Sequence, residues 1–151
     1  MRGESDVRGM IASFIDFLIH ARILRRKARR ASSVIGTRGE LAARRHLESA
    51  GYRILAMNAV TPEGEADIVA EREDRGTFAV VEVKSRVRRP DGSLFNPPER
   101  SVTARKSNRL AAIARHLAYA NDWPQVCVEI IAVEFESENS PTPAALRHHR
   151  A

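Results

Sequence analysis

Two acidic residues and a lysine lie within apolar stretches in the middle of this 151-residue sequence. Asp67 belongs to the segment GEADIV at 64–69, and Glu82 and Lys84 belong to VEVK at 81–84. Glu82 and Lys84 are two residues apart, so in a β-strand both side chains project from the same face. Burying a carboxylate among apolar residues costs free energy unless a cation or a hydrogen-bond donor compensates its charge. These three residues are therefore candidates for a chemical role.

A predicted hairpin between the two stretches decides which side chains face one another. The residues DRG at 74–76 are typical of a hairpin turn. If residue 73 lies opposite 76, Asp67 lies opposite Glu82; if 74 lies opposite 77, Asp67 lies opposite Lys84. Both registers place two carboxylates and one ammonium group on one face of the sheet.

This arrangement suits a hard divalent cation. The carboxylates of Asp67 and Glu82, with the backbone carbonyl of Val83, are candidate ligands for Mg²⁺ or Mn²⁺. Such an ion polarises a phosphoryl oxygen and lowers the pKa of a bound water. Lys84 would then orient the attacking water or stabilise the charge of the transition state. The alternative is a cross-strand ion pair that needs no metal.

Two further acids are candidates for the same site. Glu40 lies near the start of a predicted helix and would supply a third carboxylate if that helix packs over the strands. The pattern TRGE at 37–40 also fits a capping box, in which Glu40 reaches back to the helix start. Glu65 would lie at the rim of the acidic face.

The hydrophobic periodicity predicts the elements that must position these residues. Helices are predicted over 37–50 and 102–120, and strands over 52–58, 65–71, 77–86 and 126–135. A long loop is expected over 87–100. A helix between the last two strands requires a crossover and hence a parallel pair. The sequence thus predicts an α/β domain with a mixed β-sheet, flanking helices and the core order α-β-β-β-α-β.

The positive charge is concentrated outside this core. The chain has 25 Lys and Arg against 19 Asp and Glu, a net charge of +6. Residues 1–30 carry eight basic and three acidic residues, whereas residues 31–136 carry fifteen of each. We therefore predict a basic, partly apolar leader over 1–32, a domain over 33–136 and a disordered tail over 137–151. Charged residues interrupt the apolar stretch of the leader, so we expect a short amphipathic helix and no transmembrane span.

The single cysteine excludes a disulfide-stabilised scaffold and a zinc finger. The single cysteine, Cys127, forms no internal disulfide and has no neighbours at zinc-ligand spacing, which favours the reducing cytoplasm. The eight aromatic residues do not cluster into a stacking platform for single-stranded nucleic acid. His46 and His116 are interpreted as helix-surface residues, and His148 and His149 as solvated residues of the tail.

Several segments, taken together, resemble the YraN-like family of small bacterial proteins. They are GTRGELA at 36–42, GYRIL at 51–55, Asn58, GEADIV at 64–69 and VEVKSR at 81–86. They follow in matching order over about residues 33–135. This uncharacterised family belongs to the restriction-endonuclease-like PD-(D/E)XK superfamily and is similar to archaeal Holliday-junction resolvases.

The resemblance implies a metal-dependent endonuclease that hydrolyses DNA phosphodiester bonds with selectivity for substrate structure. It assigns Asp67 and Glu82 as the two acids of the motif and Lys84 as its lysine. Glu40 matches the helix glutamate of the resolvase branch, and Glu65 and Lys106 stand at recurrent family positions. Branched or duplex DNA as substrate and a homodimer are further implications of the resemblance.

Basic residues near the motif are candidate phosphate contacts. They follow the lysine or lie on the second predicted helix: Arg86, Arg88, Arg89, Arg105, Lys106 and Arg109. They are equally compatible with a solvated loop and helix face. The alternative function is a non-catalytic adaptor that binds nucleic acid or a membrane, retains the nuclease fold and uses its basic leader.

Overall fold

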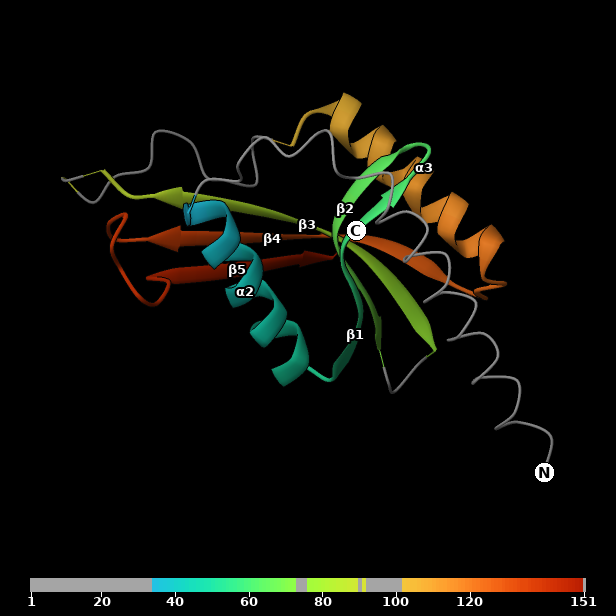
Figure 1. Cartoon of the computed structure of the whole chain (residues 1–151), viewed down its shortest axis with the longest axis horizontal. Helices are drawn as coiled ribbons and strands as arrows, with labels where there is room; N and C mark the ends of the chain where they lie inside the picture. The colour runs from blue at the N-terminus through green and yellow to red at the C-terminus, as the bar shows by residue number, and fades with distance from the viewer. Residues whose placement is uncertain (1–33, 73–75, 90, 92–101, 151) are drawn as a thin grey trace.

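A computed structural model describes residues 34–72, 76–89, 91 and 102–150 (Figure 1). Its elements, in chain order, are α2 (Val34–Ser49), β1 (Tyr52–Thr61), β2 (Gly64–Arg72), β3 (Thr77–Val87), α3 (Ala104–Ala120), β4 (Val126–Phe135) and β5 (Ala145–Arg150). No helix in these ranges is long and apolar enough to cross a membrane. The predicted leader over 1–32 and most of the predicted loop lie outside the described residues.

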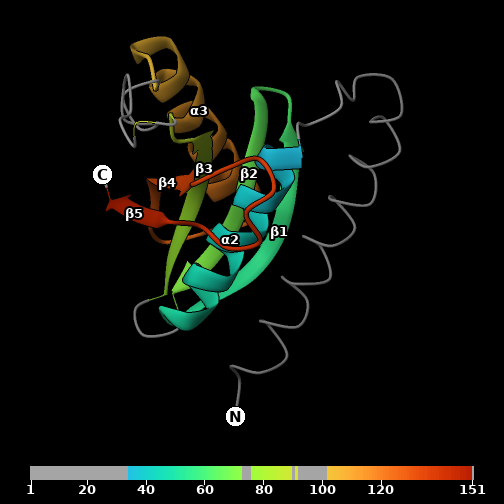
Figure 2. The ribbon, with the colours of Figure 1, turned by 90° about the vertical axis from the view of Figure 1, so that its left-hand side faces the viewer.

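The predicted α/β architecture is confirmed. The strands form one sheet in the order β1-β2-β3-β4-β5, with α2 and α3 on opposite faces (Figures 1 and 2). β1, β2 and β3 form an antiparallel meander, and α3 then makes the crossover that places β4 parallel to β3. The sheet is therefore mixed, as the helix between the last two predicted strands required.

The fifth strand corrects the prediction of a disordered tail over 137–151. Residues 145–150 pair antiparallel with β4 as β5. The sequence of β5 is polar, which is why no strand was expected there. Its polar side chains are partners of buried acids on β4, since Arg147 pairs with Glu134 and His148 Nε2 lies 2.7 Å from Glu129 Oε2.

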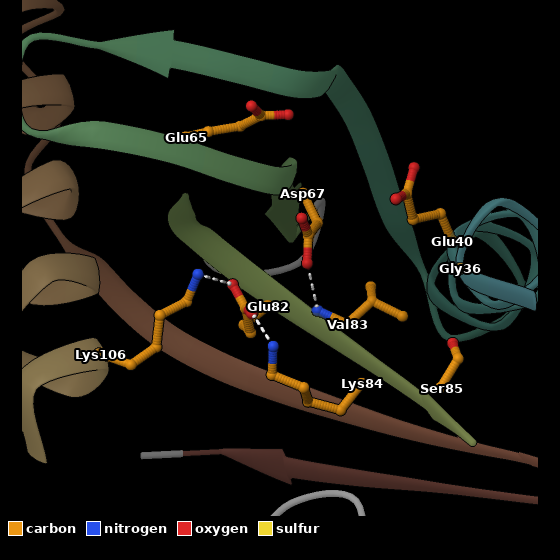
Figure 3. Close-up of a pocket in the computed structure, with 9 residues that line it drawn as sticks. All are labelled: Gly36, Glu40, Glu65, Asp67, Glu82, Val83, Lys84, Ser85 and Lys106. Carbon is orange, nitrogen blue, oxygen red and sulfur yellow. Dashed lines mark hydrogen bonds and ion pairs between the residues drawn. The ribbon is translucent and has the colours of Figure 1, made fainter. Parts of the chain in front are cut away.

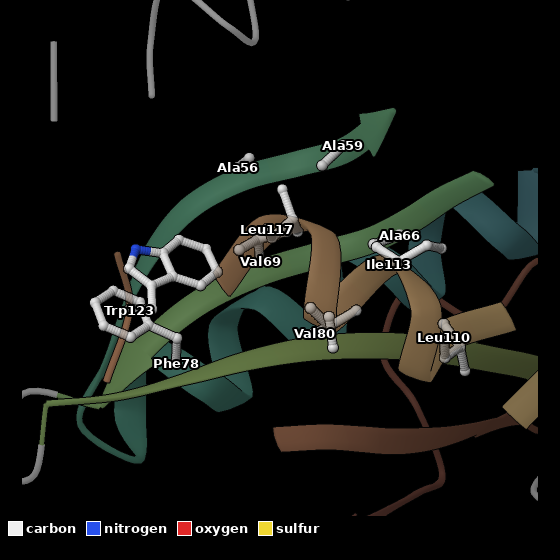
Figure 4. Close-up of a cluster of buried hydrophobic side chains, with 11 residues drawn as sticks. Ala56, Ala59, Ala66, Val69, Phe78, Val80, Leu110, Ile113, Leu117 and Trp123 are labelled. Atoms are coloured by element: carbon white, nitrogen blue, oxygen red, sulfur yellow. The ribbon is translucent and has the colours of Figure 1, made fainter. Parts of the chain in front are cut away.

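Both faces of the sheet are buried under a helix. On the α3 face, Val69 and Val80 pack with Ile113, and the rings of Phe78 and Trp123 stack with centres 4.2 Å apart (Figure 4). On the α2 face, a second cluster gathers residues from α2 and four strands: Ala43, Leu47, Tyr52, Ile68, Val81, Ile131 and Phe135. Burial on both faces explains why the central strands are continuously apolar.

The β2–β3 pairing ends in mid-strand. Its last pair is Ile68↔Val81. Earlier residues of β2 pair only with β1, and later residues of β3 pair only with β4. The register is the first of the two that the hairpin allowed, and it places Asp67 and Glu82 where the two strands separate.

Helix α2 lies against β3 at Gly39 without room for a side chain. A Cβ atom built on Gly39 would lie 1.6 Å from Ser85 Oγ and 2.8 Å from Ser85 Cβ. Thr37 is already inside α2, so the predicted capping box at 37–40 is wrong. The absence of a side chain at Gly39 allows α2 to approach β3 and brings the next residue, Glu40, close to the point of strand separation.

We predict that Gly39→Ala destabilises the fold by roughly 1–3 kcal/mol, although alanine favours helix over glycine. The Ser85 hydroxyl can rotate away from the new methyl group, but Ser85 Cβ cannot, so α2 must shift. The free energy of unfolding in urea measures the effect. Ser85→Gly alone serves as control. Combined with Gly39→Ala in a double variant, Ser85→Gly should restore part of the lost free energy of unfolding. Equal stability of Gly39→Ala and the wild type would contradict this packing.

Candidate active site

A pocket of about 420 Å³ opens where β2 and β3 separate (Figure 3). Seven residues predicted from the sequence line it: Glu40, Glu65, Asp67, Glu82, Val83, Lys84 and Lys106. Gly36 and Ser85 complete the lining. The structure thus brings the acidic residues and two lysines together in one place.

Asp67 joins the two strands at the point of separation. The backbone N–H of Val83 donates a hydrogen bond of 2.7 Å to Asp67 Oδ2, where the strand ladder has ended. Burial and the nearby Glu82 charge raise the pKa of Asp67 to about 7. The Val83 hydrogen bond and the Lys106 charge act in the opposite direction, and Glu40 adds to the increase. The Asp67 carboxyl group therefore changes its protonation state near neutral pH.

Glu82 is buried and faces two ammonium groups. Its side chain is 2% exposed, with Lys84 Nζ 2.6 Å from Oε1 and Lys106 Nζ 3.1 Å from Oε2. Lys106 comes from the first turn of α3, so its ammonium enters the pocket from a separate element. Glu82 Oε2 is nevertheless buried without a hydrogen bond of good geometry.

Glu40 reaches the pocket from α2. Asn58 Nδ2 on β1 donates a hydrogen bond of 3.2 Å to Glu40 Oε2. Figure 3 shows the Glu40 carboxylate on the α2 side of Asp67, with the two lysines on the other side. Asn58 has a positive φ of 54°, a conformation that asparagine tolerates better than most residues. Glu40 is thus held in place by a partner outside the pocket lining.

The donor set fits a hydrated Mg²⁺ or Mn²⁺. Among the described residues, no three His, Cys, Asp or Glu side chains gather closely enough to hold a metal by themselves. Mg²⁺, however, keeps several waters and commonly takes only one or two protein carboxylates. Asp67 and Glu82 provide two, and Glu82 Oε2, whose contact with the Lys106 ammonium lacks hydrogen-bond geometry, is an oxygen atom to which a cation could bind in place of that ammonium.

Three residues of this site were not predicted. Gly36 lies one helical turn before Glu40, and this spacing would have identified it once Glu40 was in a helix. Asn58 is a polar residue in an apolar strand, a signal that the sequence does contain. Ser85 follows Lys84 and has a buried hydroxyl without a hydrogen-bond partner, which only the packing of α2 reveals.

Five of the predicted phosphate contacts lie outside the pocket lining. Arg88 pairs with Glu134 at 3.1 Å and with Glu136 at 2.8 Å. Arg109 on α3 packs against Gly64, where an added Cβ would lie 3.0 Å from its Cδ. The other three do not line the pocket either: Arg86, Arg89 and Arg105.

Comparison with known sequences identifies relatives of this domain. The profile of the uncharacterised protein family UPF0102 matches residues 39–133, which include every acidic residue of the pocket. A UPF0102 protein of Symbiobacterium thermophilum is 38% identical over 102 residues, covering 66% of this chain and 81% of the relative. One from Desulfitobacterium hafniense strain Y51 is 34% identical over 112 residues, covering 72% and 88%. One from Caulobacter sp. strain K31 is 42% identical over 88 residues, 58% of each chain.

We predict that Asp67→Asn stabilises the metal-free protein at pH 8 by about 2–4 kcal/mol. With a pKa near 7 in the folded state against 3.8 ordinarily, Asp67 binds its proton more tightly when folded. The free energy of unfolding of the wild type therefore falls as pH rises from about 4 to 7. Asparagine lacks this titration and its side-chain oxygen can still accept the Val83 hydrogen bond.

Urea unfolding in EDTA between pH 4 and pH 8 measures this difference. The exposed Glu65 lies two residues away on the same strand, so Glu65→Gln is the matched control and should follow the wild type. The prediction fails if Asp67→Asn loses stability with pH as steeply as the wild type does.

Proposed function

The chain belongs to the uncharacterised protein family UPF0102, and we propose that it is a divalent-metal-dependent nuclease that hydrolyses phosphodiester bonds in DNA. One observation carries the proposal. Where β2 and β3 separate, the carboxylates of Asp67 and Glu82 line an open pocket together with the ammonium groups of Lys84 and Lys106. This combination can bind a cation and a phosphate side by side.

The charge of the pocket favours a bound cation. Its lining contains four acids and two lysines, so its formal charge is negative when all are ionised. A phosphate diester would be repelled unless a cation bound first or the acids took up protons. Asp67 and Glu82 would hold the metal, with the Val83 carbonyl and Glu40 as further ligands. The ion would supply Lewis-acid activation of the phosphate and of a water molecule.

The lysines complete the proposed site. Both ammonium groups lie within 3.1 Å of a Glu82 oxygen, so they adjoin the position of any phosphate held near that carboxylate. Lys84 follows Glu82 on the same face of β3 and would stabilise charge that develops on the phosphate. Lys106 approaches from α3 and would contact a non-bridging oxygen. The Glu82 carboxylate lies between the two ammonium groups, and its burial keeps it fixed there.

We also propose that the protein acts in the cytoplasm, since its one cysteine is half-buried and free. Branched or duplex DNA is the proposed substrate. A homodimer stays a prediction from the family resemblance.

A second candidate function is a non-catalytic adaptor that binds nucleic acid. It is favoured by the ion pairs of Glu82, because both of its oxygens already have an ammonium partner within 3.1 Å. The folded site therefore does not require a metal to neutralise this buried charge. Such a protein would bind DNA without a divalent ion and would tolerate Glu82→Gln.

We predict that the purified protein cleaves duplex, flapped or four-way DNA in Mg²⁺ or Mn²⁺. Asp67→Asn should abolish cleavage, since one of the two central carboxylates is lost. Lys84→Ala should reduce the rate by about a hundredfold or more, because it removes a charge beside the reacting phosphate. Gel electrophoresis of labelled substrates over time measures the rates.

The matched control is Glu48→Gln, which changes an exposed carboxylate near the end of α2, outside the pocket lining, and should retain most activity. The nuclease proposal is rejected if cleavage by the wild type does not exceed that of Asp67→Asn. Metal-independent DNA binding that survives Glu82→Gln would then support the adaptor.

We further predict that Lys106→Gln binds Mn²⁺ roughly tenfold more tightly than the wild type. The Lys106 ammonium competes with an incoming cation for Glu82 Oε2, and its removal ends this competition. The same variant should bind DNA more weakly, because it loses a phosphate partner. Isothermal titration calorimetry measures the first effect and fluorescence anisotropy the second. Arg105→Gln, an exposed neighbour outside the pocket lining, should leave the Mn²⁺ affinity unchanged.

A further inference from the structure

A second group of polar side chains lies on the α2 face of the sheet, among residues that the proposed nuclease does not use. Glu129 on β4 is 1% exposed and accepts a hydrogen bond of 3.0 Å from the Tyr52 hydroxyl. The Cys127 thiol lies 3.6 Å from the same carboxylate oxygen. The other oxygen of Glu129 lies 2.7 Å from Nε2 of His148 on β5. His46 Nε2, in the last turn of α2, lies 3.3 Å from His148 Nδ1.

The two imidazole nitrogens lie close enough either to share a hydrogen bond or to bind one metal ion together. Their ring centres lie 5.2 Å apart, with planes at 81°. A straight N–H···N hydrogen bond of this length would place the centres about 5.6 Å apart. Two imidazoles on one tetrahedral zinc, with bonds of about 2.05 Å, have nitrogens about 3.3 Å and ring centres about 5.2 Å apart. The observed distances are those of the second arrangement and equally of a bent hydrogen bond, so the rings are already placed as two ligands of one ion would be.

We propose that His46 and His148 form a binding site for a transition-metal ion of the Zn²⁺ type, between α2 and β5. Glu129 takes the role that a carboxylate commonly has beside a metal-bound histidine. Its contact with Nε2 of His148 leaves Nδ1 as the nitrogen that faces His46. The ion would replace the proton shared by the two rings.

The ligand types set the choice of metal. Imidazole nitrogen favours Zn²⁺, Ni²⁺ and Cu²⁺, whereas Mg²⁺ prefers oxygen. The positive charge of Arg150 acts on His46 and opposes cation binding, so the affinity should be moderate. Two protein ligands leave coordination positions for water, which reaches the partly exposed His46. This site therefore differs in chemistry and in position from the carboxylate pocket at Asp67.

Zinc binding would connect the two segments that carry the histidines. α2 provides Glu40 to the carboxylate pocket, and β5 is the terminal strand of the sheet. An ion that binds only the folded chain raises its stability in proportion to the logarithm of its concentration. The proposed site would thus stabilise the packing of β5 and α2 on the sheet, independently of any nuclease activity.

The test uses the full chain without a histidine tag. Both metals are compared in the Asp67→Asn background, which lacks a carboxylate of the other site. There we expect Zn²⁺ to bind at one ion per chain and to raise the Tm, whereas an equal concentration of Mg²⁺ does not. Co²⁺ should give the visible absorption of a tetrahedral site with nitrogen ligands. His46→Ala should lose both the Zn²⁺ shift and the Co²⁺ spectrum, since it removes one of the two ligands.

The control is His149→Ala, which changes the adjacent histidine on the opposite face of β5 and should retain zinc binding. His46 is partly exposed, so its replacement should leave the chain folded, which circular dichroism verifies. In the Asp67→Asn background, the absence of saturable Zn²⁺ binding, or equal binding with and without His46→Ala, would overturn the proposal. Neither result bears on cleavage of DNA, so the two proposals fail separately.

Discussion

The hydrogen bond from the Val83 backbone to the Asp67 carboxylate is the interaction on which the candidate site depends. It forms where β2 stops pairing with β3, so a side chain takes over from the strand ladder. Without it, Val83 would have a backbone donor without a β2 partner, and Asp67 would lose the contact that most favours its charged form. Strand separation and the acidic pocket are therefore two aspects of one local structure.

Much of the fold was predictable because its signals are local. Alternation identified the strands that carry Asp67 and Glu82, and a helix before the last apolar strand required the parallel β3–β4 pair. The hairpin limited the register to two choices, and the structure selects the one that opposes Asp67 to Glu82. Strand β5 was missed because its stability comes from Arg147 and His148 meeting buried acids, a long-range effect that periodicity does not detect.

The site was predictable only where its residues share an element or adjoining strands. Lys106 was identified as a phosphate contact, but its proximity to Glu82 depends on how α3 packs over the sheet. The hydrogen bond between Asn58 and Glu40 likewise joins β1 to α2. At Gly39, by contrast, it is the missing side chain that lets α2 lie close to β3. Helix propensity scales rate glycine only as unfavourable and do not indicate this role.

The position of Lys106 in the chain has a consequence for biosynthesis. The carboxylates of the pocket all precede residue 83, whereas Lys106 belongs to α3, which is translated later. When the segment of β1, β2 and β3 has been made, the chain contains all four acids of the pocket and only one of its two lysines, Lys84. Until α3 docks, the second ammonium group of the pocket is missing, so the pocket reaches its final charge only when the crossover helix is in place.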